Sequence, residues 1–215
     1  MRRGAFITVE GAEGVGKSTS LAAIERHLRA RGIDLLLTRE PGGTGLGEQV
    51  RSWILDGDHG ALSANVEALL MFAARSQHLD TRIRPALEAG TWVICDRFTD
   101  ATLAYQGGGR GASARFLSCL TAEVQRGLAP DLTLLLDAPV EVGLGRIASR
   151  SHDHFEREDR DFFERVRASY LQIAAAEPGR VKLVDASAAV DAVERQIMAQ
   201  LEAFCVSFDG GGVGA

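Results

Sequence analysis

Cysteine is scarce in this chain of 215 residues, which has only Cys95, Cys119 and Cys205. They are far apart and form no Cys-x-x-Cys pair, which argues against a disulfide framework or a zinc site and favours a reducing compartment. No apolar run approaches the ~18 residues that a membrane helix needs. The apolar stretch near the start ends at Glu10, too early for a signal peptide. We therefore expect a cytoplasmic protein without a membrane partner.

Lysine and asparagine are also nearly missing. Lys17 and Lys182 are the only lysines, so 22 of the 24 basic residues are arginines, whose planar guanidinium suits phosphate and carboxylate groups. The single asparagine, Asn65, excludes the Asn-Lys-x-Asp loop of guanine-specific GTPases. The net charge of -5 gives no reason to expect binding to DNA or RNA. A small anionic substrate remains compatible with this composition.

Short apolar runs alternate with longer stretches of helical periodicity. Five runs that are apolar at nearly every position predict strands covered on both faces: Ala5–Glu10, Asp34–Thr38, Trp92–Asp96, Leu132–Asp137 and Val181–Asp185. The stretches predicted as helices are Leu21–Arg31, Val66–Ala89, Ala114–Gly127, Val140–Arg150, Asp161–Ala176 and Ala189–Phe204. This alternation predicts an α/β fold, with a five-stranded parallel sheet flanked by helices on both faces.

The chain contains no internal repeat and no Pro/Ser-rich linker, so we predict one domain over residues 1–208. Residues 209–215 are rich in glycine and can bury little, which predicts a disordered tail. Residues 149–161 are almost wholly charged and separate two predicted helices, which makes them the candidate for a mobile lid.

A glycine-rich motif follows the first predicted strand and opens the first predicted helix. It matches G-x-x-x-x-G-K-[ST], the phosphate-binding loop (P-loop) that gives the P-loop NTPase fold its name. Its backbone N–H groups converge on phosphate oxygens, while the lysine contacts the β- and γ-phosphates and the hydroxyl binds Mg²⁺. We therefore expect ATP to be bound by residues Gly11, Ala12, Glu13, Gly14, Val15, Gly16, Lys17, Ser18 and Thr19.

An acidic residue and an arginine end the third predicted strand. Asp96 is placed to assist Mg²⁺ beside the P-loop, with Asp137 at the end of the fourth strand as its rival. Arg97 can hold a second phosphate, that of an acceptor, which predicts a small-molecule kinase. The alternatives are a kinase for another nucleoside monophosphate or metabolite and a regulator that binds nucleotide without turnover.

Six short runs occur in order along the chain: Gly11–Thr19, Thr38–Thr44, Asp96–Phe98, Tyr105–Gly111, Pro130–Thr133 and Asp161–Phe163. Together they resemble bacterial thymidylate kinases, which are P-loop nucleoside-monophosphate kinases. The resemblance implies transfer of the γ-phosphoryl of ATP to dTMP in dTTP synthesis, and it implies a homodimer.

The resemblance also implies roles for individual side chains. Phe72 would stack on thymine, a position that Met71 could share, and Arg75 would bond the carbonyl edge of the base. Tyr105 would close over the sugar, and Glu13 would lie near the sugar 3′-OH and the reacting phosphates. The full set implied for substrate binding is Arg39, Arg51, Phe72, Arg75, Arg97, Thr102, Tyr105 and Gln106.

In this family a catalytic arginine comes from the P-loop or from the lid. Since residues 11–18 contain no arginine, the resemblance assigns the role to Arg150, with Arg146 and Arg157 as alternates. Together with Lys17, Glu13 and Arg97, this arginine completes the predicted catalytic set. The chain departs from the Asp-Arg-x-Glu pattern of the family lid, because His154 stands at the arginine position. Residues 185–187 resemble the loop that passes the adenine.

Overall fold

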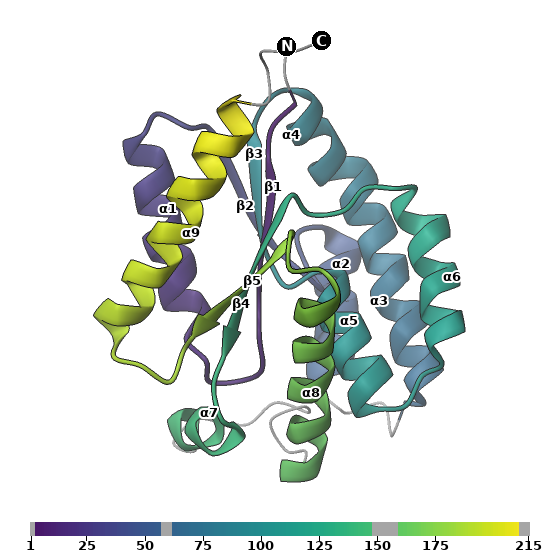
Figure 1. Ribbon diagram of the computed structural model, residues 1–215. Helices are drawn as coiled ribbons and strands as arrows, with labels where there is room; N and C mark the ends of the chain where they lie inside the picture. Colours follow the sequence, from purple (N-terminus) through teal and green to yellow (C-terminus); the bar gives the residue numbers. More distant parts are fainter. Residues whose placement is uncertain (1–2, 57–61, 148–158, 211–215) are drawn as a thin grey trace.

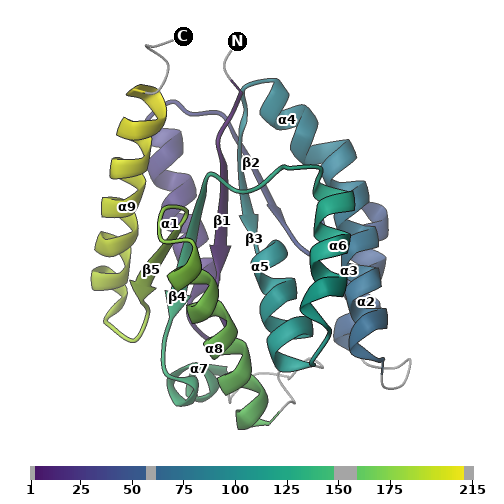
Figure 2. The ribbon, with the colours of Figure 1, turned by 45° about the vertical axis from the view of Figure 1, so that its right-hand side comes forward.

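The computed structural model of the chain describes residues 3–56, 62–147 and 159–210. Its five strands are β1 (Phe6–Glu10), β2 (Leu35–Arg39), β3 (Trp92–Asp96), β4 (Leu132–Asp137) and β5 (Val181–Asp185). All pairs are parallel and the order is β2-β3-β1-β4-β5. Helix α1 (Lys17–Ala30) and helix α9 (Val190–Gly210) cover one face, and most other helices gather on the opposite face (Figures 1 and 2). The predicted α/β fold is confirmed.

The central strands are the most apolar and the most buried. Every residue of β1 is buried, and only the terminal Asp96 and Asp137 of β3 and β4 are partly exposed. The edge strands β2 and β5 leave Leu37 and Leu183 exposed. This gradient is the one expected of a sheet packed between two helical layers. The predicted strand bounds are correct except for a one-residue shift at the start of β1 and at both ends of β2.

The long helix predicted over residues 66–89 is interrupted. It begins at Ala64, where the Ser63 hydroxyl accepts a hydrogen bond from the Val66 N–H, and continues as α3 (Ala64–His78). A π-helical turn, η1 (Leu79–Ile83), then leads into α4 (Arg84–Glu88). Such a turn inserts a residue into the helical ladder, a change that apolar periodicity does not reveal.

Three further helical segments were not predicted. They are α2 (Gly45–Asp56), α5 (Thr99–Thr102) and the π-helical η2 (Leu103–Gly109). Glycine and threonine have low helix propensity, so these sequences carry a weak local signal. Burial against distant elements compensates, because Ala104 and Tyr105 of η2 are buried in one apolar cluster with Phe162 and Val166.

The other helices agree with the prediction apart from their ends. They are α6 (Ala114–Gln125), α7 (Val140–Ile147) and α8 (Arg160–Ala176). Helix α9 continues to Gly210 and so includes the first two residues of the predicted tail, while 211–215 lie outside the described residues. Residues 149–158 of the predicted lid, 149–161, also lie outside them, whereas Asp159 caps α8 by accepting the Phe162 N–H.

The topology brings the predicted site residues to one edge of the sheet. The carboxyl ends of parallel strands meet at the same edge, and ligands of open α/β sheets bind there. Strands β1 and β3 are neighbours, with Val9 paired to Asp96, so the loop after β1 lies beside the end of β3. Within the described parts, no helix is both long and apolar enough to cross a membrane.

Candidate active site

The loop between β1 and α1 depends on its glycines. Gly11, Gly14 and Gly16 have φ of 136°, 71° and 90°, values that side-chain-bearing residues rarely adopt. A Cβ on Gly14 would lie 2.1 Å from the carbonyl oxygen of Gly143, so the loop packs against α7 backbone to backbone. Helix α1 starts at Lys17, four residues earlier than predicted, and no side chain caps its N-terminus. The first N–H groups of a helix lack intrahelical partners and can bind a phosphate.

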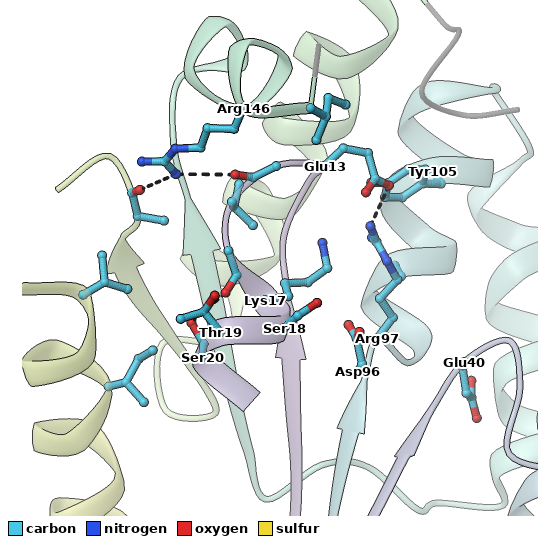
Figure 3. A pocket seen from close by; sticks show the side chains of 18 of the residues that line it. Glu13, Lys17, Ser18, Thr19, Ser20, Glu40, Asp96, Arg97, Tyr105 and Arg146 are labelled. Atoms are coloured by element: carbon cyan, nitrogen blue, oxygen red, sulfur yellow. Dashed lines mark hydrogen bonds and ion pairs between the residues drawn. The ribbon is translucent and has the colours of Figure 1, made fainter. Parts of the chain in front are cut away.

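Lys17 lies over this loop. Its Nζ donates to the carbonyl oxygens of Gly11 at 3.1 Å and Ala12 at 2.8 Å, and Figure 3 shows the ammonium directed into the cavity. Burial and the nearby positive charge of Arg97 together lower the pKa of Lys17 to about 8, against the raising effect of Glu13. An anion bound in the loop would therefore stabilise the charged form of this buried ammonium.

Arg97 faces the same loop from the end of β3. Its Nη1 donates to the Gly11 carbonyl oxygen at 3.1 Å, the same acceptor that Lys17 uses, and its Nη2 contacts Glu13 Oε1 at 2.7 Å. Arg97 has φ of 66°, an uncommon value that turns the chain sharply after the strand. The structure therefore brings the two cationic groups predicted from sequence together around one carbonyl oxygen.

Glu13 balances part of this positive charge. Its Oε1 accepts the Arg97 guanidinium and the Tyr105 hydroxyl, the latter at 2.9 Å. Burial opposes its ionisation, but Arg97 and Lys17 outweigh that effect and lower the pKa of Glu13. The Arg97 guanidinium also stacks 4.8 Å from the centre of the Tyr105 ring. Loop, strand end and η2 are thus connected through one carboxylate.

The two candidate metal-binding carboxylates differ in their surroundings. Both oxygens of Asp137 accept hydrogen bonds from Arg167, at 2.7 and 2.8 Å. Asp96 borders the cavity with Ser18, and its buried Oδ1 has no hydrogen-bond partner among the residues that the structure describes. These residues also include no group of three or more His, Cys, Asp or Glu side chains arranged to hold a metal. Magnesium needs few protein ligands when phosphate and water supply the others, so Asp96 and Ser18 fit it.

A cavity of about 560 Å³ lies over the loop. We call one part of its wall the α9 side, formed by Ala186, Ala188, Val190, Val193 and Ile197. We call the opposite part the α3 side, formed by Glu40, Arg51, Met71, Tyr105 and Gln106. The loop and the end of β3 complete the wall, with Glu13, Gly14, Val15, Gly16, Lys17, Ser18, Thr19, Asp96 and Arg97. Figure 3 shows Glu13, Lys17, Ser18, Thr19, Asp96 and Arg97 between the two sides. Gly11 and Ala12, which were also predicted, are not part of the cavity wall; their carbonyl oxygens accept hydrogen bonds from Lys17.

Arg75 supports the α3 side from behind. It is fully buried, and its Nε donates to Glu40 Oε2 at 2.6 Å while its Nη2 donates to the Thr102 hydroxyl at 2.9 Å. Glu40 Oε1 lies 3.0 Å from His78 Nδ1. The remaining nitrogen, Arg75 Nη1, is buried without a hydrogen-bond partner in the described parts of the chain. An unpaired buried donor is costly, which marks this nitrogen as a group able to bond a ligand.

Phe72 and Arg39 do not border the cavity. Phe72 is 2% exposed in an apolar cluster that joins α3 to α6, where its ring also supports the Arg75 guanidinium at 4.6 Å. Met71, the neighbouring residue, is in the cavity wall instead. Arg39 has a half-exposed side chain that pairs with Glu48. Phe72 is placed as core, the usual location of an apolar helix residue, and its predicted stacking role has no support from the wall.

Arg51 and Gln106 do border the cavity, as predicted. Arg51 Nη1 donates to the Pro41 carbonyl oxygen at 3.3 Å, and burial together with the charges of Arg39 and Arg97 lowers its pKa. Gln106 Nε2 donates to Glu67 Oε2 at 3.0 Å. The α3 side therefore presents a cation and an amide to the cavity.

Of the three lid arginines considered, Arg150 and Arg157 lie outside the described residues. Arg146 is in the cavity wall, where its Nη1 donates to the carbonyl oxygens of Ala186 at 3.0 Å and Gly14 at 3.4 Å (Figure 3). It thereby bridges the loop and the α9 side.

Sequence reasoning did not assign a role to Glu40, Glu67 or most of the α9 side. Glu40 lies within a motif that supported the family resemblance, and Glu67 is an acidic residue in the middle of an apolar helix stretch, a weak sign of a buried partner. The apolar α9 side carries no local signal, because its residues line a wall only once α9 packs beside β5.

Comparison with known proteins agrees with this geometry. A sequence model of the family described as thymidylate kinase matches residues 9–197. The thymidylate kinase of Alkalilimnicola ehrlichii is 53% identical over 195 residues, which cover 90% of each chain. That of Pseudomonas syringae pv. syringae is 57% identical over 185 residues, or 86% of this chain and 88% of the other. The crystal structure of the Ehrlichia chaffeensis thymidylate kinase superposes with a TM-score of 0.74 at 32% identity, covering 93% of this chain and 99% of that one. The family model covers most of the chain and the relatives are more than half identical to it, so the chain belongs to the thymidylate kinase family.

Proposed function

We propose that this protein transfers the γ-phosphoryl group of ATP to dTMP, giving ADP and dTDP, a step toward dTTP. One observation carries the proposal: Lys17 and Arg97 donate to the same Gly11 carbonyl oxygen within a single cavity. A protein that only binds nucleotide needs one phosphate site. Two cationic groups that share one acceptor atom suit a donor phosphate and an acceptor phosphate that face each other.

The α9 side and the loop suit ATP. The loop N–H groups and Lys17 bind the phosphates, because backbone donors at a helix N-terminus and a buried ammonium favour negative charge. The apolar residues of the α9 side suit the flat adenine ring, and the Arg146 guanidinium lies beside them. The resemblance of residues 185–187 to an adenine loop supports this placement.

The α3 side suits dTMP. Arg97 and Arg51 border the part of the cavity that the acceptor phosphate would occupy. Arg75 Nη1 is a buried donor for a base carbonyl oxygen, and Thr102 holds the guanidinium in place. The Tyr105 hydroxyl donates to Glu13, which supports a role for the phenol ring in closing over the sugar. Arg39 keeps a proposed role at the phosphate only if its exposed side chain turns from Glu48 toward the cavity.

Ser18 and Asp96 would hold Mg²⁺. When bound, the ion neutralises charge on the β- and γ-phosphates. The protein's part is to position and neutralise. Lys17 contacts the transferred group, Arg97 holds the acceptor, and Glu13 fixes Arg97 through their 2.7 Å contact. Burial of these groups excludes water, which would otherwise accept the phosphoryl group. We also propose that Arg150 closes over the γ-phosphate from the lid and acts as the catalytic arginine.

We further infer a homodimer in the cytoplasm that binds neither nucleic acid nor membrane. Exposed apolar side chains on α2 and α3, namely Leu46, Trp53, Val66 and Leu69, support self-association. Size-exclusion chromatography with multi-angle light scattering tests the oligomeric state, and a monomeric mass at micromolar concentration would contradict the homodimer.

The proposal is tested by measuring ADP release with ATP and a panel of acceptors: dTMP, dCMP, AMP, CMP and shikimate. We expect the highest kcat/KM with dTMP and slow release without an acceptor. Preference for another acceptor would reject the substrate assignment. ATP binding without phosphoryl transfer to any of them would favour the nucleotide-dependent regulator.

A further inference from the structure

Glu67 is a buried carboxylate behind the α3 side. It lies on α3 and is 1% exposed. Its Oε2 accepts a hydrogen bond from Gln106 Nε2 at 3.0 Å, and its Oε1 lies 3.4 Å from Arg110 Nε. Acidic residues are almost never fully buried unless they are paired. Both partners come from η2 and the residue after it, so Glu67 anchors the segment that carries Gln106.

This contact fixes the orientation of the Gln106 amide. A carboxylate beside an arginine accepts hydrogen bonds and has none to donate, so Gln106 must turn its NH₂ group toward Glu67. The carbonyl oxygen Oε1 is then the amide atom left for a ligand. It is buried, and it has no hydrogen-bond partner within the described residues. Because Gln106 borders the cavity, we expect this oxygen to accept a hydrogen bond from a ligand bound there.

Two unpaired groups complement one base, namely Gln106 Oε1 of the α3 side and Arg75 Nη1 behind it. Thymine offers an N3–H donor next to carbonyl oxygens, whereas cytosine offers a bare N3 acceptor next to an amine. The Gln106 carbonyl oxygen matches the N3–H of thymine and opposes the N3 of cytosine. We propose that Glu67 is a positioning residue that selects thymine over cytosine by holding the Gln106 amide in this orientation. The inference rests on the proposed function, since it refines how the same site chooses its acceptor.

Glu67→Gln tests this with little change in shape. Glutamine at position 67 has one oxygen and one NH₂ group to serve two neighbours. The arrangement that satisfies both turns its oxygen to Arg110 and its NH₂ to Gln106. Gln106 must then turn its own oxygen to position 67 and present its NH₂ group to the base. The variant thus exchanges an acceptor for a donor at N3.

The measurement is kcat/KM for dTMP and dCMP with ATP, in the original protein, in Glu67→Gln and in the exposed control Glu123→Gln. In Glu67→Gln we expect the dTMP-to-dCMP ratio to fall by about 10- to 100-fold, with a higher KM for dTMP and an unchanged KM for ATP. Some preference for dTMP remains, because Arg75 still opposes the cytosine amine. Glu123→Gln should keep the original ratio. An unchanged ratio in a folded Glu67→Gln protein overturns the inference.

Two outcomes are separated by the design. An original protein without activity on dTMP refutes the proposed function, and the inference with it. An active original protein whose Glu67→Gln variant keeps full discrimination refutes the inference alone. If circular dichroism shows that Glu67→Gln is unfolded, the double variant Glu67→Gln, Gln106→Glu replaces it. That protein regains an acceptor-only side chain at position 106 and should prefer dTMP as before; loss of the preference would contradict the proposal.

Discussion

The loop side and the α3 side of the cavity are built in different ways. The loop uses backbone groups and one lysine from nine consecutive residues, 11–19, so its geometry is local. The α3 side uses side chains from distant segments, with Arg75 joining Glu40 to Thr102 in the interior. Backbone groups recognise phosphate in any nucleotide, whereas fixed side chains recognise one base. We therefore expect nucleotide binding to tolerate side-chain substitutions in the α3 side, whereas the choice of acceptor depends on its buried network.

Breaking the network should produce the largest effect. Glu40→Ala leaves the Arg75 guanidinium buried without its carboxylate, and removing one partner of a buried pair costs about 3–5 kcal/mol in free energy of unfolding. Chemical denaturation measures this loss. Where the variant stays folded, dTMP affinity should fall while ATP affinity remains.

Glu48→Ala is the matched control, because Glu48 pairs with Arg39 at the surface. Exposed pairs contribute about 0–1 kcal/mol, so this variant should unfold nearly as the original protein does. Equal destabilisation by the two substitutions would contradict the contrast between a buried and an exposed pair.

Removing the loop lysine should affect turnover instead of folding. Lys17→Ala deletes a charge that contacts the transferred group, and we expect kcat to fall by about 10²- to 10³-fold, the loss typical of one such donor. Lys182→Ala, at the only other lysine, removes a contact to the Pro178 carbonyl oxygen. Neither residue is part of the cavity wall, so the variant should leave kcat unchanged. Steady-state kinetics with saturating dTMP decides; similar rates for the two variants would remove Lys17 from the mechanism.

The local loop side could be predicted from the sequence more fully than the α3 side, whose residues come from distant segments. The loop, the strands and Asp96–Arg97 were predicted because their signals are local. The positions of Phe72 and Glu67 depend on how α3 packs against α6 and η2, and that of Arg39 depends on its pairing with Glu48 of α2. No short sequence window contains these contacts. Glycine and threonine weaken the helical signal of residues 99–109, so η2 became visible only through its contacts with α8.

Glu10 is the last residue of β1 and is fully buried, and we expect it to have a smaller, pH-dependent effect. Its Oε1 accepts the Phe98 N–H at 2.7 Å and its Oε2 accepts the Tyr170 hydroxyl at 2.9 Å. Burial, aided by the charge of Asp100, raises its pKa from 4.5 to about 7. The folded protein therefore keeps a proton between pH 4.5 and 7 that the unfolded chain has lost, so the free energy of unfolding falls as pH rises through this window.

Glu10→Gln should remove this dependence, because the amide does not ionise. Between pH 5 and pH 8, the free energy of unfolding of the original protein should fall by about 1–3 kcal/mol more than that of the variant. Denaturant titrations at several pH values provide the measurement. Parallel pH profiles for the two proteins would show that Glu10 does not titrate in this range.

The central claim is that Lys17 and Arg97 hold two phosphates at once, and a linked ligand tests it most directly. Adenosine and thymidine joined through a polyphosphate chain should bind at least ~10²-fold more tightly than ATP or dTMP alone, because both sites are filled by one molecule. Isothermal titration calorimetry gives the affinities, with ATP alone measured in each variant because Arg97 also contacts the loop. We predict that Lys17→Ala and Arg97→Ala each remove the gain. Binding no tighter than that of ATP, and unaffected by Arg97→Ala, would show that the two groups do not face each other across one transferred phosphoryl group.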